Sequence, residues 1–241
     1  AKSKLYIGAD TITGGNQPSA KQLPGRKLEG GAPETLIEIG KDEESQVEIA
    51  ADYDFHQRLY GKDGYWMLPE AEAGNTAPFH PWKLAISLLM NPPDTRFSHP
   101  FIDKTIGTLK RGTTDRSKET FDSLTSWQYS GDSIEMRIPW MLLGFSDPSS
   151  LQVIDYGPLK ERSYFGTTTT DGIRLIPWIV QRDGSGVSWP GGDQKTLNVQ
   201  SLPLYTWKQW DTVQYSEQLK QSYYIMKDAF TKISGPKEKK E

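Results

Sequence analysis

SIEMRIPWMLLGFSDPSS, residues 133–150, contains the change of pattern that decides the fold. Every second residue from Ile134 to Ile138 is apolar, which is typical of a half-buried strand. Pro139 cannot donate a hydrogen bond to a sheet, so we expect the strand to end there and one apolar helical turn to follow. Gly144 can adopt the left-handed conformation that ends such a turn. The stretch therefore predicts a strand that runs into a short covering helix.

The same alternation appears in several segments outside this stretch. Residues 121–130 and 132–140 flank a Ser130-Gly131 turn, which predicts an antiparallel hairpin with one apolar face. Further strands are expected in four segments, residues 4–10, 34–40, 45–54 and 171–181. The sequence KLAISLLM, residues 83–90, predicts a short buried strand or a helical turn. With 22 Gly and 16 Pro in the chain, many of them between these segments, we predict an all-β, antiparallel fold with long loops.

The C-terminal part changes to a helical pattern. Apolar residues recur there at intervals of four and three, which predicts an amphipathic helix; they are Leu219, Tyr223, Met226, Phe230 and Ile233. Asp211 is expected to cap its start, and Gly235-Pro236 to end it. We thus expect three parts: a β domain over 1–206, a helix packed on it over 207–235 and a charged tail over 236–241. A partner helix is the alternative use of the apolar stripe.

Composition excludes several classes of function. Lys and Arg number 28 against 31 Asp and Glu, for a net charge of −3, so the chain lacks the basic surplus needed to bind a nucleic acid backbone. There is no cysteine, which removes disulfides, thiolate catalysis and cysteine-ligated metals. No apolar run approaches the roughly 20 residues that cross a bilayer.

Catalytic and metal-binding motifs are incomplete. Around Ser146 a nucleophile elbow would need a second glycine where Pro148 stands, so no catalytic residue is assigned. His56, His80 and His99 lack zinc-ligand spacing, and we expect them to pack in loops or lie at the surface.

Two acidic features leave alternatives open. Asp52 and Asp54 could hold a structural calcium ion, although no complete calcium loop surrounds them, and they are otherwise turn formers. No spacing in the sequence identifies two carboxylates that could cleave a glycosidic bond. Glycoside cleavage therefore stays an alternative.

Aromatic residues are numerous, with 8 Trp, 11 Tyr and 8 Phe, and they point to a binding function. We expect Trp127, Trp140 and Trp178 to lie in the core, and Trp207 and Trp210 to hold the final helix. The aromatics in Gly- and Pro-rich loops could present flat faces to a ligand, with polar side chains beside them. The candidate ligand-binding residues are Tyr65, Trp66, Trp82, Trp189, Asn75, Gln181, Arg182 and Asp193.

Several of these stretches resemble a known family. IEMRIPWMLLGFSDPSS, LYIGADTITGGN and VEIAADYDFHQRLYG resemble strands of the carbohydrate-binding module family 9-like group within the DOMON-like superfamily. The tail, LYTWKQWD followed by YSEQLKQSYYIMKDAF, resembles the C-terminal end of long bacterial surface or secreted proteins. The resemblance covers most of the chain, although only RIPW is specific. It implies an antiparallel β-sandwich, jelly-roll-like, that binds a glycan without cleaving it; calcium is common in the group.

The sequence departs from the family at its start. Family members usually have one or two strands before the segment that matches KLYIGAD, residues 4–10. We expect a preceding piece of polypeptide or a partner subunit to supply them, because an unpaired edge would otherwise aggregate.

Taken together, the sequence favours a non-catalytic carbohydrate-binding module of a larger extracellular or cell-surface bacterial protein. The alternatives are a subunit of a polysaccharide-acting glycoside hydrolase, an architectural interaction domain, and a haem-binding relative.

Overall fold

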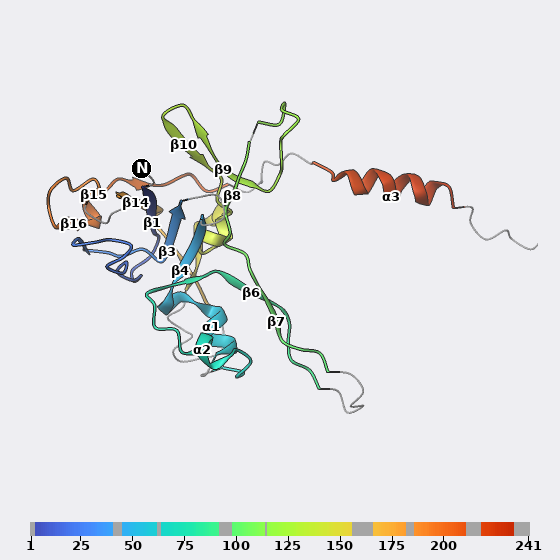
Figure 1. The fold of residues 1–241 in the computed structure, drawn as a ribbon, viewed down its shortest axis with the longest axis horizontal. Helices are drawn as coiled ribbons and strands as arrows, with labels where there is room; N and C mark the ends of the chain where they lie inside the picture. The colour runs from blue at the N-terminus through green and yellow to red at the C-terminus, as the bar shows by residue number, and fades with distance from the viewer. Residues whose placement is uncertain are drawn as a thin grey trace, which may run out of the picture. The chain divides into compact units, whose positions relative to one another are not determined.

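The computed structural model describes residues 3–40, 45–61, 64–91, 98–113, 115–155, 166–181, 186–210 and 218–233. The described chain is mostly strands in antiparallel sheets with few helices, which confirms the predicted all-β class (Figure 1). It forms two compact units, Ala1–Gln209 and Trp210–Glu241. None of the described helices is long and apolar enough to cross a membrane.

A seven-stranded sheet forms the centre of the first unit. Its order is β15-β14-β1-β3-β4-β5, and β17 also pairs with β14. The bounds are β1 Lys4–Asp10, β3 Thr35–Ile39, β4 Gln46–Ala50, β5 Phe79–Pro81, β14 Ile173–Val180, β15 Val187–Ser188 and β17 Leu204–Tyr205.

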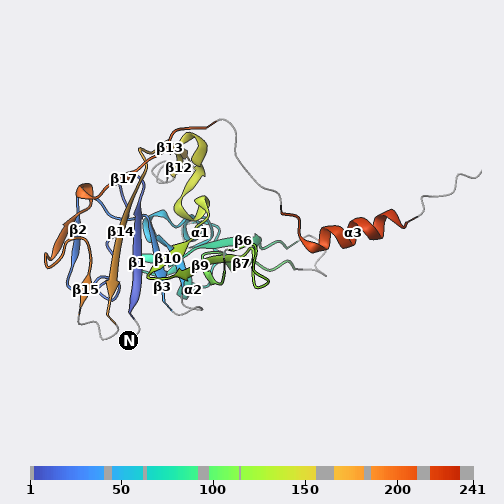
Figure 2. The ribbon, with the colours of Figure 1, turned by 90° about the horizontal axis from the view of Figure 1, so that it is seen from above.

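Strand β1 lies inside this sheet, between β14 and β3 (Figures 1 and 2). All seven of its residues, from Lys4 opposite Val180 to Asp10 opposite Arg174, have a partner on β14. Strands of this same chain pair with both sides of β1, so β1 is not an edge strand. The further strands expected from a preceding piece of polypeptide or a partner subunit stay a prediction.

The two faces of the central sheet carry separate cores, as the two-residue period of strands requires. On one face Tyr6 stacks on Trp178, with ring centroids 5.5 Å apart and an interplanar angle of 17°. Leu28 and Leu197 join that cluster from the parallel pair β2 (Lys27–Glu29) and β16 (Thr196–Asn198).

The opposite face packs against the hairpin and the helical turn that were expected within residues 121–150. Its buried cluster includes Ile37, Val47, Trp82, Trp127 and Leu142. Trp127 comes from the hairpin of β9 (Thr125–Ser130) and β10 (Ser133–Met136), and β9 also pairs in parallel with β8 (Lys110–Arg111). The predicted hairpin is thus confirmed, but its turn is Gly131-Asp132 instead of Ser130-Gly131, because Ser130 still pairs with Ser133 in the ladder.

The stretch after Pro139 folds as its residues predict. The 3₁₀ helix η3 spans Trp140–Leu143, and Gly144 follows it with φ +83°, in the left-handed region. Leu142 is buried, but Trp140 remains 38% exposed, so its predicted place in the core is wrong. Its ring instead contacts Trp207, 4.9 Å away between centroids.

The remaining elements form smaller units. Strands β11 (Phe145–Asp147), β12 (Gln152–Asp155) and β13 (Gly166–Thr169) make one sheet. Strands β6 (Lys83–Ser87) and β7 (Ile102–Thr105) make a hairpin that extends from the central sheet (Figure 1). The short helices are η2 (Ala51–Tyr53), α1 (Phe55–Tyr60), α2 (Glu70–Ala73), η4 (Pro148–Ser150) and η6 (Val199–Ser201).

The β6 strand is one of the two forms expected for KLAISLLM, but it is not a buried one. Leu84 is 44% exposed and Ile86 63% exposed, so the burial predicted for this segment is wrong.

Helix α3 spans Gln221–Thr231 and is described within the second unit. It lies inside the helix predicted over 207–235, while the capping residues Asp211 and Gly235-Pro236 lie outside the described residues. Packing of the helix on the β domain stays a prediction. Trp207 belongs to the first unit, where its Nε1 donates to the carbonyl of Pro148 at 2.9 Å. This hydrogen bond ties the chain around Trp207 to the segment around Pro148.

We predict that Gly144→Ala lowers the free energy of unfolding by about 1 kcal/mol, because a side chain in the left-handed region clashes with its own backbone. Since a Cβ at Gly144 would meet no atom within 4 Å, the loss reflects this conformation alone. Urea unfolding measures it, and Gly144→Asn should lose less, because Asn tolerates this region better. Equal stability of Gly144→Ala and the parent would contradict the assignment.

Candidate functional site

Two of the predicted ligand residues, Tyr65 and Trp66, are exposed aromatic side chains between α1 and α2. Tyr65 is 67% exposed and Trp66 is 72% exposed, although both are large aromatic side chains. We call this pair the aromatic platform.

Backbone hydrogen bonds fix the platform loop. The amides of Tyr65 and Trp66 donate to the carbonyls of Leu59 and Gly61, at 2.8 and 3.3 Å. Trp66 has φ +57°, which is uncommon for a residue with a side chain and is held here by these contacts. The Tyr65 ring also lies 6.3 Å from that of Tyr60. The platform is therefore presented by an ordered turn.

A hollow of about 380 Å³ lies beside the platform. It is lined by Trp66, Leu68, Glu70, Ala73 and Gly74. The indole and the aliphatic side chains provide an apolar wall, and the exposed carboxylate of Glu70 is a hydrogen-bond acceptor. Asn75, another predicted residue, is exposed and directly follows Gly74, with its side-chain oxygen accepting from the amide of Ala77.

Trp82 and Trp189 do not form platforms, contrary to the expectation for loop tryptophans. Trp82 is 2% exposed and packs 5.5 Å from Phe55. Trp189 is 8% exposed, and its Nε1 donates to the carbonyl of Gly192 at 3.0 Å. Both rings belong to the two cores of the central sheet.

The remaining predicted residues do not gather at the platform. Gln181 follows β14 and is exposed, and Asp193 lies in an exposed turn, where its carbonyl accepts from Arg26 at 2.7 Å. Arg182 lies outside the described residues.

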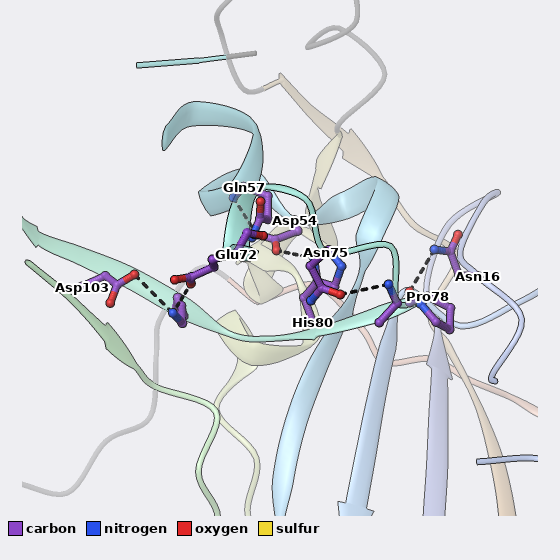
Figure 3. A network of polar contacts seen from close by, with 10 residues as sticks. Asn16, Asp54, Gln57, Glu72, Asn75, Pro78, His80 and Asp103 are labelled. Carbon is purple, nitrogen blue, oxygen red and sulfur yellow. Dashed lines mark hydrogen bonds and ion pairs between the residues drawn. The ribbon is translucent and has the colours of Figure 1, made fainter. Parts of the chain in front are cut away.

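A polar network behind the platform loop joins α1 to β5 (Figure 3). Asp54 caps α1 by accepting from the amide of Gln57 at 3.1 Å, and its other oxygen lies 2.8 Å from Nδ1 of His80. Asp54 and His80 are both buried, and this contact gives each a polar partner, while Nε2 of His80 makes no hydrogen bond within the described residues. Both oxygens of Asp54 thus contact protein groups. Asp54 and Asp52, which the sequence suggested as calcium ligands, are not part of a cluster of potential metal ligands in the described residues.

A second part of this network brings His56, Glu72 and Asp103 together, with potential ligand atoms within 4.8 Å of one another. It is the one group of three such side chains in the part of the chain that the structure describes. Nε2 of His56 lies 3.2 Å from Asp103, and burial lowers the pKa of His56 despite that carboxylate.

Lys83 already supplies the positive charge at this cluster. Its Nζ pairs with Glu72 and lies 3.4 Å from Asp103. Although burial opposes it, the hydrogen bond to Glu72 raises the pKa of Lys83. We therefore interpret the cluster as an internal ion-pair network that supports the platform loop.

A separate pocket of about 520 Å³ lies where β1 ends and β14 begins, and the sequence analysis missed it. Its polar lining includes Asp10, Asp171, Arg174 and Gln200. Asp10 is only 6% exposed, and it stands directly opposite Arg174 in the β1–β14 pair. Only this pairing register, which no motif reveals, brings the two residues together.

Asp10, which lines this pocket, and Glu34, which is bonded to the lining residue Thr11, hold protons more tightly than usual. Burial raises the pKa of Asp10 to about 6, although Arg174 acts against the shift. Burial also raises the pKa of Glu34 to about 8, against the hydrogen bonds that it accepts from the amide and hydroxyl of Thr11. The folded chain therefore binds protons here that the unfolded chain releases near pH 4.

We predict that the free energy of unfolding falls as the pH rises from about 5 to about 9. Because the folded pKa values are raised, this stabilisation is complete below the unfolded values and is lost as the pH passes the folded ones. Glu34 contributes a slope of up to about 1.4 kcal/mol per pH unit. Urea unfolding at several pH values measures the effect.

Glu34→Gln should flatten this pH dependence, whereas the exposed Glu29→Gln should leave it as it is. A Glu34→Gln variant with an unchanged slope would show that Glu34 is ionised in the folded chain.

No protein-family model, curated protein or solved structure matches this chain.

Proposed function

We propose that this chain binds a glycan without cleaving it, through sugar rings stacked on the aromatic platform of Tyr65 and Trp66. The observation that carries the proposal is the exposure of these adjacent rings, 67% and 72%, on a loop that backbone hydrogen bonds hold in place. Large aromatics are usually mostly buried, so two exposed neighbours on a fixed turn favour a contact surface.

The hollow beside the platform supports the same ligand class. A sugar has apolar C–H faces and hydroxyl groups at its edge. Trp66 and Leu68 offer an apolar wall for the former, and Glu70 offers an acceptor for the latter. Because the loop is already ordered, little conformational entropy is lost on binding.

We further propose that the first unit is a β-sandwich module. In support, the β9–β10 hairpin and η3 pack their apolar side chains on one face of the central sheet. The resemblance to family 9-like carbohydrate-binding modules supports a place in a larger bacterial surface or secreted protein. The rest of that protein would then direct the module to its glycan.

We predict that Trp66→Ala lowers the affinity for a soluble polysaccharide about tenfold or more, because it removes a stacking face worth more than about 1 kcal/mol. Affinity electrophoresis through gels that contain xylan, β-glucan, mannan or pectin identifies the ligand, and calorimetry measures the variants. Tyr65→Ala should show a smaller loss, since the phenol ring offers less area.

Tyr129→Ala is the matched control, because Tyr129 is 56% exposed on a different element, strand β9. Binding that survives Trp66→Ala and Tyr65→Ala together would refute the platform. Release of reducing sugar by the purified chain would instead favour the glycoside hydrolase alternative.

A further inference from the structure

The pocket between β1 and β14 contains charged groups for which the protein provides no partner. Within the described residues, the carboxylate of Asp10 makes neither a hydrogen bond nor an ion pair, although the residue is only 6% exposed. Nε of Arg174 is likewise buried without a hydrogen-bond acceptor. A buried ionic group without a partner is costly, so both groups are suited to a ligand that enters the pocket.

Other buried carboxylates of the chain show that this arrangement is not general. Asp54 is paired with His80, Glu38 with Lys4, and Glu48 accepts from Gln22 at 3.0 Å. The fold thus satisfies these acids with its own residues. Glu34 accepts two hydrogen bonds from Thr11 through one oxygen, and its other oxygen has no partner within the described residues. Asp10 differs from the paired acids and also lines the cavity.

The sheet register sets the spacing of the two charges. Directly opposite residues of an antiparallel pair have Cβ atoms about 4.5–5.5 Å apart and share one face. Asp10 and Arg174 have this relation, yet no ion pair within 4.0 Å joins them in the described structure. Their charges are therefore neighbours that a compact ligand can contact together.

Glycine keeps the space above Asp10 open. A Cβ at Gly31 would lie 3.0 Å from Oδ2 of Asp10, so a side chain there would crowd the carboxylate. Asp171 contributes a second, exposed carboxylate to the lining. The pocket thus offers two negatively charged hydrogen-bond acceptors, the carboxylates of Asp10 and Asp171, and one positively charged donor, the guanidinium of Arg174.

We propose that this pocket binds a small zwitterion of the α-amino acid type, with its ammonium group against Asp10 and its carboxylate against Arg174. An ammonium group has three donors, and a guanidinium grips a carboxylate through two parallel hydrogen bonds. In an α-amino acid both groups are attached to one carbon, which fits charges on directly opposite residues. The volume of about 520 Å³ leaves room for the side chain.

Other ligand classes fit these charges less well. A neutral sugar would leave Asp10 and Arg174 without counter-charges, and a metal ion would meet the guanidinium of Arg174. This inference does not depend on glycan binding at the aromatic platform, because it uses different residues and a different ligand.

The test is calorimetry and thermal unfolding of the full chain with each of the common free L-amino acids. We expect at least one of them to bind with one site per chain and to raise the unfolding temperature. Its amide and its N-acetyl derivative each lack one charge, so both should bind about tenfold or more weakly. If no free amino acid binds, or if the derivatives bind equally well, the proposal is overturned.

Variants locate the site. Asp10→Asn and Arg174→Gln should each weaken binding about tenfold to a hundredfold, because each removes a hydrogen bond to a charged group. Asp132→Asn, at the exposed turn between β9 and β10, is the control and should bind like the parent. Asp171→Asn lies at an exposed position and serves if Asp10→Asn does not fold.

Unchanged affinity in all three pocket variants would overturn the assignment, as would binding of neutral monosaccharides at this pocket in place of amino acids. Trp66→Ala should leave amino-acid binding unchanged, so failure of one proposal is distinguishable from failure of the other.

Discussion

The antiparallel pairing of β1 with β14 is the constraint on which the rest of the structure depends. It joins Lys4–Asp10 to residues near the other end of the first unit and places β1 inside the sheet. Stacking of Tyr6 on Trp178 across this pair fixes which side chains face each core. A shift of one residue would turn the side chains of one strand to the opposite face and separate Tyr6 from Trp178. The apolar pattern therefore specifies this register strongly.

The same register creates the polar pocket as a consequence of the fold. Asp10 is the last residue of β1 and Arg174 the second of β14, so correct pairing of the cores brings these charges together at one end. The platform arises differently, because Tyr65 and Trp66 lie on a local turn between two short helices. Polar contacts link these two helices to strands: Asp54, at the start of α1, contacts His80 on β5, and Glu72 on α2 pairs with Lys83 on β6 (Figure 3).

The sequence predicts those features whose causes are local. Alternation predicts β1, the β9–β10 hairpin and β14, and Pro139 with Gly144 predicts the bounds of η3. Features that depend on distant packing were missed or wrong. The composition around Trp82 and Trp189 predicts exposed loop tryptophans, yet both lie in the cores because each adjoins a strand: Trp82 lies between β5 and β6, and Trp189 follows β15. The pocket depends on a pairing that no single segment encodes.

The balance of charge differs between the polar network behind the platform and the pocket between β1 and β14. At the network behind the platform, each buried acid faces a cation or a donor from the chain, as when Lys83 stands between Glu72 and Asp103. The charges of this network are already balanced, so it gains little from a further charged ligand, although Nε2 of His56 and Nε2 of His80 make no hydrogen bond within the described residues. At the pocket, within the described residues, the carboxylate of Asp10 makes no hydrogen bond or ion pair and Nε of Arg174 has no hydrogen-bond acceptor, although burial has already desolvated Asp10. A ligand that supplies both counter-charges would recover interactions that folding left unmade, which is why the pocket rather than the histidine cluster has the character of a binding site.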